Sequence, residues 1–189
     1  MVDPMRIQGF AGLGDQRPIG NLIAFSAPVA GQAALRGRFQ DRDFTQQAEN
    51  ALGFPLPEDT KHAAGDGARR IFRLGPDHWL ALDDVDASFG GRLEGTDCLR
   101  AIDVSSTRAR LRLQGSAVRD LLSVGAQIDL RTRSFPAGAF AQTPVGNATA
   151  ILYAREENIF DVLIARSFAQ SWLVWLEHTG REFGLKLSQ

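Results

Sequence analysis

The chain has 189 residues, 44% hydrophobic and 23% charged, which is typical of a globular protein with one core or two small ones. Its 21 basic and 22 acidic residues give a net charge of -1, so no global field attracts nucleic acid or an anionic membrane. The single cysteine, Cys98, excludes an intrachain disulfide, and no apolar run approaches the ~18 residues of a membrane span. These features predict a cytoplasmic protein.

The first quarter of the chain predicts a tail, two strands and a helix. Residues 1–18 are rich in glycine and are expected to form an N-terminal tail or clamp. Short apolar segments at 19–25 and 33–39 are typical of strands. Residues 41–52 have apolar side chains at helical spacing, and Gly53 follows them, so this segment is predicted to be a helix.

A hairpin is predicted next, at residues 69–82, where two apolar runs flank the turn sequence Gly75-Pro76-Asp77. The polar segment before it, 58–68, is expected to be a loop. Residues 84–93 show a weaker helical pattern that includes Gly90 and Gly91.

Residues 100–130 predict two strands followed by a helix. Side chains alternate strictly between apolar and basic over 107–113, which indicates a half-buried strand. A shorter apolar run at 101–104 precedes it, and the polar residues 105–107 predict a hairpin turn between the two. Ser116 is expected to cap the helix that follows, and Gly125 to end it.

The last third predicts three strands, at 139–145, 149–154 and 159–165, and then a helix over 168–183 capped by Ser167. The whole order of elements predicts an α+β fold built from two fused α/β-sandwich modules of mainly antiparallel strands with packed helices. We expect one domain over 19–189, with modules at about 33–104 and 105–189.

The search for catalytic chemistry gives mainly negative results. His62, His78 and His178 are scattered, without the spacing of metal ligands. Asp83 and Asp84 are sequence neighbours, which point in opposite directions on a strand, and a serine near Asp103 is typical of turns. The sequence therefore predicts no catalytic, cofactor-binding or metal-binding residue.

Arg108, Arg110 and Arg112 form a predicted basic row, and Arg131 and Arg133 follow further along the chain. Such guanidinium groups suit the carboxylates of a partner or an anionic ligand. The alternative is a solvated sheet face with weak local ion pairs. In either case the row is expected to be dispensable for folding, because exposed ion pairs contribute little to stability. The three arginines are the first candidate interface.

Trp172 and Trp175 lie on the predicted last helix, where one apolar stripe cannot easily bury both rings. We expect Trp172 to belong to the core. Trp175 is a candidate interface residue, because exposed aromatic side chains often anchor protein contacts.

Four segments carry a resemblance to a known family: LGPDHWLAL (74–82), AIDVSSTRARLRLQGSAVRDLLSVGAQIDL (101–130), RSFPAGAFAQTPVGNATAILY (133–153) and LIARSFAQSWLVWL (163–176). In this order they resemble the gamma subunit of heterotetrameric sarcosine oxidase. That family is similar to part of the folate-binding aminomethyltransferase fold, the T-protein of the glycine cleavage system, which agrees with the two predicted modules.

The resemblance implies a non-catalytic subunit with alpha, beta and delta subunits as partners. The alpha and beta subunits would carry FAD, FMN, NAD and the tetrahydrofolate site, and delta would carry zinc. The complex would demethylate sarcosine oxidatively to glycine, with hydrogen peroxide and transfer of the one-carbon unit to tetrahydrofolate. The alternatives are a gamma-like subunit of a related N-methyl amino acid dehydrogenase and a stand-alone folate-binding one-carbon transfer protein.

Overall fold

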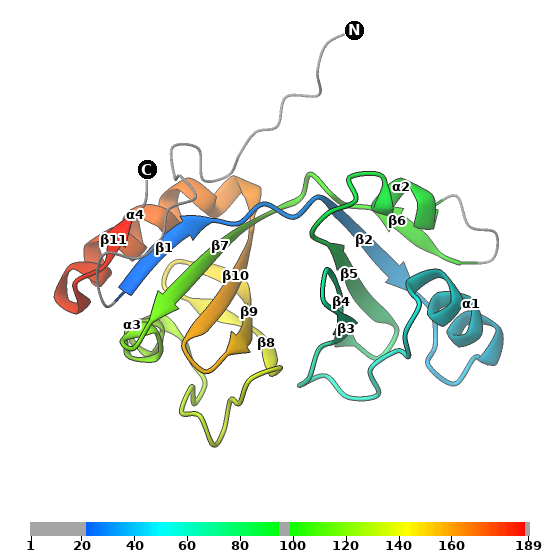
Figure 1. Cartoon of the computed structure of the whole chain (residues 1–189), viewed down its shortest axis with the longest axis horizontal. Helices are drawn as coiled ribbons and strands as arrows, with labels where there is room; N and C mark the ends of the chain where they lie inside the picture. Colours follow the sequence, from blue (N-terminus) through cyan, green and yellow to red (C-terminus); the bar gives the residue numbers. More distant parts are fainter. Residues whose placement is uncertain (1–21, 95–98, 188–189) are drawn as a thin grey trace, which may run out of the picture. The chain divides into compact units, whose positions relative to one another are not determined.

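The computed structural model describes residues 22–94 and 99–187. Within them the chain forms two compact units, a five-stranded unit (Val29–Ser105) and a six-stranded unit made of residues 22–28 and 106–187 (Figure 1). Each unit has one mainly antiparallel sheet with helices packed on it, which confirms the predicted α+β class. The tail at 1–18 and Cys98 lie outside the described residues. None of the described helices is both long and apolar enough to span a membrane.

The five-stranded unit is antiparallel throughout, and its core lies between the sheet and two helices. Its strands, in sheet order, are β3 (Ala64–Asp66), β4 (Arg69–Gly75), β5 (His78–Asp83), β2 (Gly31–Arg36) and β6 (Ala101–Asp103), and its helices are α1 (Arg42–Leu52) and α2 (Phe89–Glu94).

Local sequence signals account for α1 and for the hairpin of β4 and β5. The carboxylate of Asp41 accepts hydrogen bonds from the backbone N–H groups of Asp43 and Phe44, at 3.1 and 3.4 Å, and so caps the start of α1. Gly53 ends the helix in the left-handed region, at φ 89°. Both predicted elements are confirmed.

The weak helix predicted at 84–93 is shorter than expected. Asp83 accepts hydrogen bonds from the N–H groups of Val85 and Asp86, at 2.8 and 2.9 Å, and this turn chemistry delays the helix to Phe89. Gly90 permits close packing, because a Cβ there would lie 2.4 Å from Asp103 Oδ1 and 2.6 Å from the Gln32 carbonyl oxygen. The predicted loop at 58–68 also contains the short strand β3.

The six-stranded unit places β7 and β10 at the centre of its sheet. Its strands, in sheet order, are β11 (Lys186–Leu187), β1 (Leu22–Ser26), β7 (Arg108–Gly115), β10 (Ile159–Ala165), β9 (Ala148–Glu156) and β8 (Phe140–Val145), and its helices are α3 (Val118–Gly125), α4 (Ala169–Gly180) and the short 3-10 helices η1 (Arg166–Phe168) and η2 (Arg181–Phe183). All neighbours are antiparallel except β1 and β11. The sequence assigned β1 to neither module.

Helices α3 and α4 bury their apolar stripes against the sheet of this unit. Trp172 is fully buried, as predicted, and its indole N–H donates to the Val145 carbonyl oxygen at 2.9 Å. The predicted serine caps are wrong. The residues at the two N-cap positions are Ala117 and Phe168, and neither helix has a side-chain cap hydrogen bond.

The hairpin predicted between 101–104 and 107–113 is also wrong. β6 pairs with β2 in the five-stranded sheet, whereas β7 pairs with β1 and β10 in the six-stranded sheet. Ser105 lies at the end of one unit, where its hydroxyl accepts a hydrogen bond from the Gln32 N–H at 2.9 Å. The polar residues 105–107 therefore connect two units.

Replacing Trp172 with alanine should lower the free energy of unfolding by about 3 to 5 kcal/mol, because it removes a large buried aromatic ring and its hydrogen bond. Chemical denaturation measures this loss. Val174→Ala is the control, since Val174 is 59% exposed on the same helix and should change stability by less than about 0.5 kcal/mol. A loss below about 1 kcal/mol for Trp172→Ala would contradict the core assignment.

Candidate functional site

Three neighbouring strands of the six-stranded unit bring charged side chains to one face of the sheet. Arg112 on β7 lies opposite Asp161 on β10, and Asp161 lies opposite Tyr153 on β9. Alternate residues of a strand share a face, so Arg110 joins Arg112, and Arg155 joins Tyr153. The other face carries the apolar residues that pack against α3 and α4.

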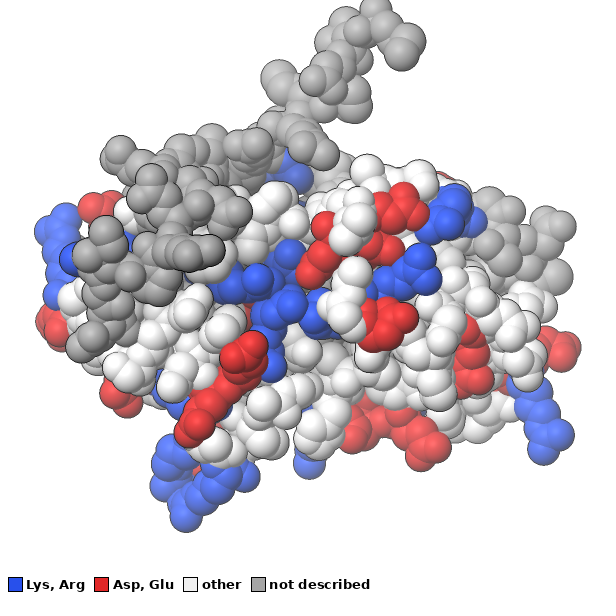
Figure 2. Space-filling model, viewed as in Figure 1, with Lys and Arg blue, Asp and Glu red and all other residues white. Residues whose placement is uncertain are grey.

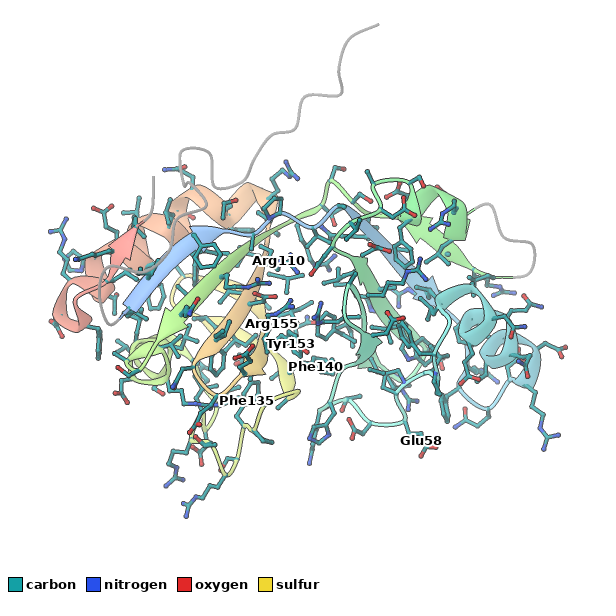
Figure 3. The ribbon with its side chains drawn as sticks, viewed as in Figure 1. Glu58, Arg110, Phe135, Phe140, Tyr153 and Arg155 are labelled. Carbon is teal, nitrogen blue, oxygen red and sulfur yellow. The ribbon has the colours of Figure 1, made fainter. Side chains whose placement is uncertain are left out.

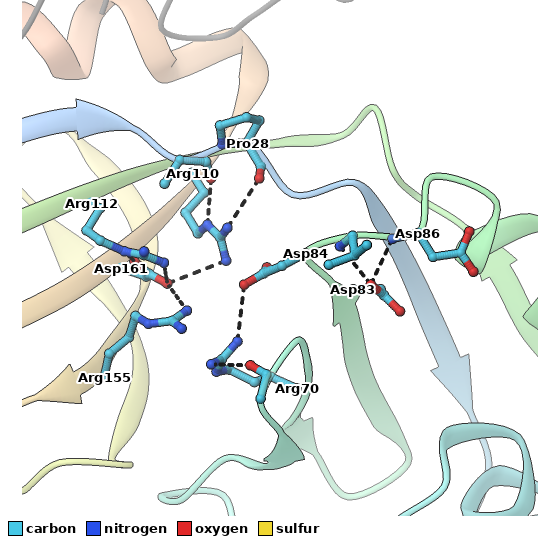
Figure 4. A network of polar contacts seen from close by, with 12 residues as sticks. Pro28, Arg70, Asp83, Asp84, Asp86, Arg110, Arg112, Arg155 and Asp161 are labelled. Carbon is cyan, nitrogen blue, oxygen red and sulfur yellow. Dashed lines mark hydrogen bonds and ion pairs between the residues drawn. The ribbon is translucent and has the colours of Figure 1, made fainter. Parts of the chain in front are cut away.

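Asp161 is the centre of this arginine cluster, which consists of Arg110, Arg112, Arg155 and Asp161 (Figure 4). The carboxylate is 1% exposed. It accepts two hydrogen bonds from Arg112, at 2.6 and 3.0 Å, and one from Arg155 Nη1 at 3.1 Å. Arg110 Nη1 completes the cluster at 3.5 Å from Asp161 Oδ2.

Arg110 also fixes the end of β1. Its Nε donates to the Ala27 carbonyl oxygen at 2.6 Å, and its Nη2 donates to the Pro28 carbonyl oxygen at 3.2 Å. One guanidinium thus joins the backbone after β1 to the carboxylate on β10, across β7. Figure 3 shows Arg110 and Arg155 with the side chains around them.

The electrostatics of the cluster keep Asp161 ionised. Burial by itself raises the pKa of the Asp161 carboxyl, because the charged form loses its hydration. The hydrogen bonds from Arg112 and the positive charges of the three arginines outweigh burial and hold that pKa below its usual value. Asp161 and the three arginines therefore form an ion-pair network that serves the structure of the unit.

The structure corrects the picture of a solvent-exposed basic row. Arg110 is buried, at 5% exposed, and Arg108 and Arg112 are half-buried. Arg110 and Arg112 bind Asp161 within their own unit, so replacing the row with glutamine would uncover a buried charge. The expectation that the row is dispensable for folding fails on this geometry. A contact of Arg108, Arg110 or Arg112 with a partner stays a prediction.

Trp175 packs within the six-stranded unit. A Cβ added at Gly125 would lie 2.5 Å from its ring, and one at Gly146 would lie 2.4 Å away. The ring centroids of Trp172 and Trp175 are 5.7 Å apart. Trp175 is half-buried, and its role at an interface stays a prediction.

The acids that the sequence search considered also serve local structure. Asp83 accepts from Arg69 Nε at 2.9 Å in addition to the two backbone N–H groups of its turn. The Ser105 hydroxyl donates to Asp103 Oδ1 at 2.6 Å. Among residues 22–94 and 99–187, no group of three or more potential ligands is placed to hold a metal ion.

Sequence reasoning missed Asp161 and Arg155, which hold the cluster together. A signal was present, because Asp161 is the one charged residue in the otherwise apolar strand Ile159–Ala165. An acid inside an apolar strand needs a cationic partner on a neighbouring strand. Arg131 and Arg133 do not belong to the row, because they are exposed residues of the loop between α3 and β8.

Asp161→Asn should destabilise the chain by about 3 to 5 kcal/mol, because buried Arg110 and the partly buried Arg112 and Arg155 would lose the carboxylate that they share. Asp161 has a lowered folded-state pKa, so its contribution is complete above the unfolded pKa of ~3.9 and is lost as pH falls through the folded value. Denaturation from about pH 7 to about pH 3 should therefore show a steeper acid loss for wild type than for the variant.

The control for this series is Glu177→Gln, which removes one partner of the exposed pair with Arg181 and should cost less than about 1 kcal/mol. Equal stability of Asp161→Asn and wild type near neutral pH would contradict the role of Asp161.

The chain matches a family model and a curated relative. Residues 36–182 match the model of the sarcosine oxidase, gamma subunit family. A curated relative, sarcosine oxidase subunit gamma of Corynebacterium sp. (strain U-96), is 27% identical over 137 residues, which are 70% of this chain and 67% of the relative.

Two solved structures share the fold. Heterotetrameric sarcosine oxidase from Corynebacterium sp. U-96, in complex with pyrrole 2-carboxylate, includes a chain with a TM-score of 0.80 and 24% identity, and 87% of each chain is covered. The glycine cleavage system aminomethyltransferase T from Bartonella henselae has a TM-score of 0.57 and 14% identity, over 89% of this chain and 48% of that one. The match of one family model to residues 36–182 shows that the chain belongs to the sarcosine oxidase gamma subunit family.

Proposed function

We propose that this chain is the non-catalytic gamma subunit of a heterotetrameric sarcosine oxidase, with alpha, beta and delta subunits as its partners. The complex would demethylate sarcosine oxidatively to glycine, form hydrogen peroxide and pass the one-carbon unit to tetrahydrofolate. FAD, FMN, NAD and tetrahydrofolate would be bound by other subunits. The single observation that carries the proposal is the family match over residues 36–182.

The internal chemistry of the chain supports a structural role. Asp161, the most buried carboxylate of the six-stranded unit, is neutralised by arginines of the same unit. In the five-stranded unit, Asp83 is held by Arg69 and by two backbone N–H groups. A general acid or base needs a pKa near the working pH, whereas the pKa values of both carboxyls lie below their usual range.

A second candidate is a stand-alone folate-binding one-carbon transfer protein, which the likeness to the aminomethyltransferase fold favours. This chain covers only 48% of that enzyme chain, so half of the enzyme has no counterpart here. A gamma-like subunit of a related N-methyl amino acid dehydrogenase would differ from the first proposal only in the substrate that its partners bind.

A tagged copy of the chain, purified from the cells that produce it, should bring down larger chains whose eluate shows flavin absorption. The same eluate should oxidise sarcosine and release hydrogen peroxide, and a comparison with other N-methyl amino acids identifies the substrate. Cells that express the tag on an unrelated protein provide the control. Recovery of a colourless single chain that binds folate tightly would contradict the subunit proposal and favour the second candidate.

A further inference from the structure

The loop between α3 and β8, residues 126–139, has both sides of its tip anchored in the core of the six-stranded unit. Leu130, near the start of the tip, and Phe135, directly after it, are only 2% and 6% exposed. The Phe135 ring stacks on Phe160, with centroids 6.1 Å apart and an interplanar angle of 13°. Figure 3 labels Phe135 at the base of this loop.

Arg119 on α3 fixes the same two sides of the tip. Its Nη1 donates to the carbonyl oxygens of Leu130 and Phe135, the second at 2.9 Å, and its Nε donates to the Glu157 carbonyl oxygen at 3.0 Å. The guanidinium carbon lies 4.9 Å from the centroid of the Phe160 ring. Burial lowers the pKa of Arg119, because the cation loses part of its hydration where it binds the loop.

The tip itself, residues 129–134, is a closed turn. Asp129 accepts hydrogen bonds from the Arg131 N–H at 3.0 Å, from the Arg131 guanidinium at 2.6 to 3.0 Å and from the Ser134 hydroxyl at 2.7 Å. The Ser134 N–H donates to the Arg131 carbonyl oxygen at 2.8 Å. Asp129 and Arg131 therefore neutralise each other and order the backbone of the tip.

Arg133 is the charged residue of the tip that takes no part in these hydrogen bonds. It is exposed, and within residues 22–94 and 99–187 it has no hydrogen bond or ion pair. Figure 2 shows basic side chains at the lower left of the view, where Figure 1 places the loop between α3 and β8. An arginine on a rigid turn offers a planar, two-pronged donor that fits a carboxylate.

We propose that residues 129–134 form a preformed basic docking tip, in which Arg133 pairs with a carboxylate on an acidic segment of another subunit of the complex. This inference rests on the proposed function, because it needs those subunits as partners. A turn that is ordered before binding loses little conformational entropy on association. Arg133 can therefore bind a carboxylate without a large entropic cost from ordering the loop. The charge also steers the encounter with an acidic surface.

The test uses the full chain and the purified remaining subunits of its complex, with association rates measured across a salt series. Arg133→Glu should slow association roughly tenfold at low salt, because it places a carboxylate against an acidic segment. The difference should shrink as the Debye length falls from ~10 Å at 0.1 M salt to ~3 Å at 1 M. Arg133→Lys keeps the charge and should retain most of the rate.

Arg38→Glu is the matched control, since Arg38 is an exposed arginine of the five-stranded unit and its reversal changes the net charge equally. It should behave as wild type, and all variants should melt at the wild-type temperature. A wild-type rate and salt slope for Arg133→Glu would overturn the docking tip alone, as would equal slowing by Arg38→Glu. Failure of the wild-type chain to assemble would overturn the proposed function and the docking tip together.

Discussion

The ion pairs around Asp161 are the constraint on which the six-stranded unit depends. A carboxylate that is 1% exposed on the central strand β10 is tolerated only when cations surround it, and β7 and β9 supply three. The guanidinium of Arg110 also donates to the carbonyl oxygens of Ala27 and Pro28, so it fixes the segment that follows β1. The apolar face of β7 is thus buried in the core, and its charged face is partly buried around the carboxylate.

The sequence predicts the elements that local signals determine, and it does not predict which strands pair across the chain. Helix α1 and the hairpin of β4 and β5 follow from Asp41, Gly53 and the Gly75-Pro76-Asp77 turn, which act within a few residues. Alternation over 107–113 predicts a strand correctly, but it carries no information on which sheet that strand joins, so the hairpin with β6 was wrong. Strands β3 and β11 are too short for any periodic signal.

The candidate site was predictable in its residue types and not in its pairing. The basic row was visible in the sequence, whereas its partner Asp161 lies some fifty positions away and meets it only through the register of β7 with β10. Arg110 and Arg112 bind Asp161 inside their own unit. The exposed Arg133 lies on a loop that Arg119 holds in place. The chain therefore separates the charges that maintain its fold from the charge that we assign to assembly.

Hydrogen exchange of the chain, alone and in the assembled complex, tests this separation most directly. Residues 131–134 are exposed to solvent in the free chain, and exchange of their amides should slow further when the other subunits bind. Amides of β7 are already paired with β1 and β10, and their exchange should not change. Unchanged exchange throughout residues 129–134, with new protection elsewhere in the chain, would contradict the account.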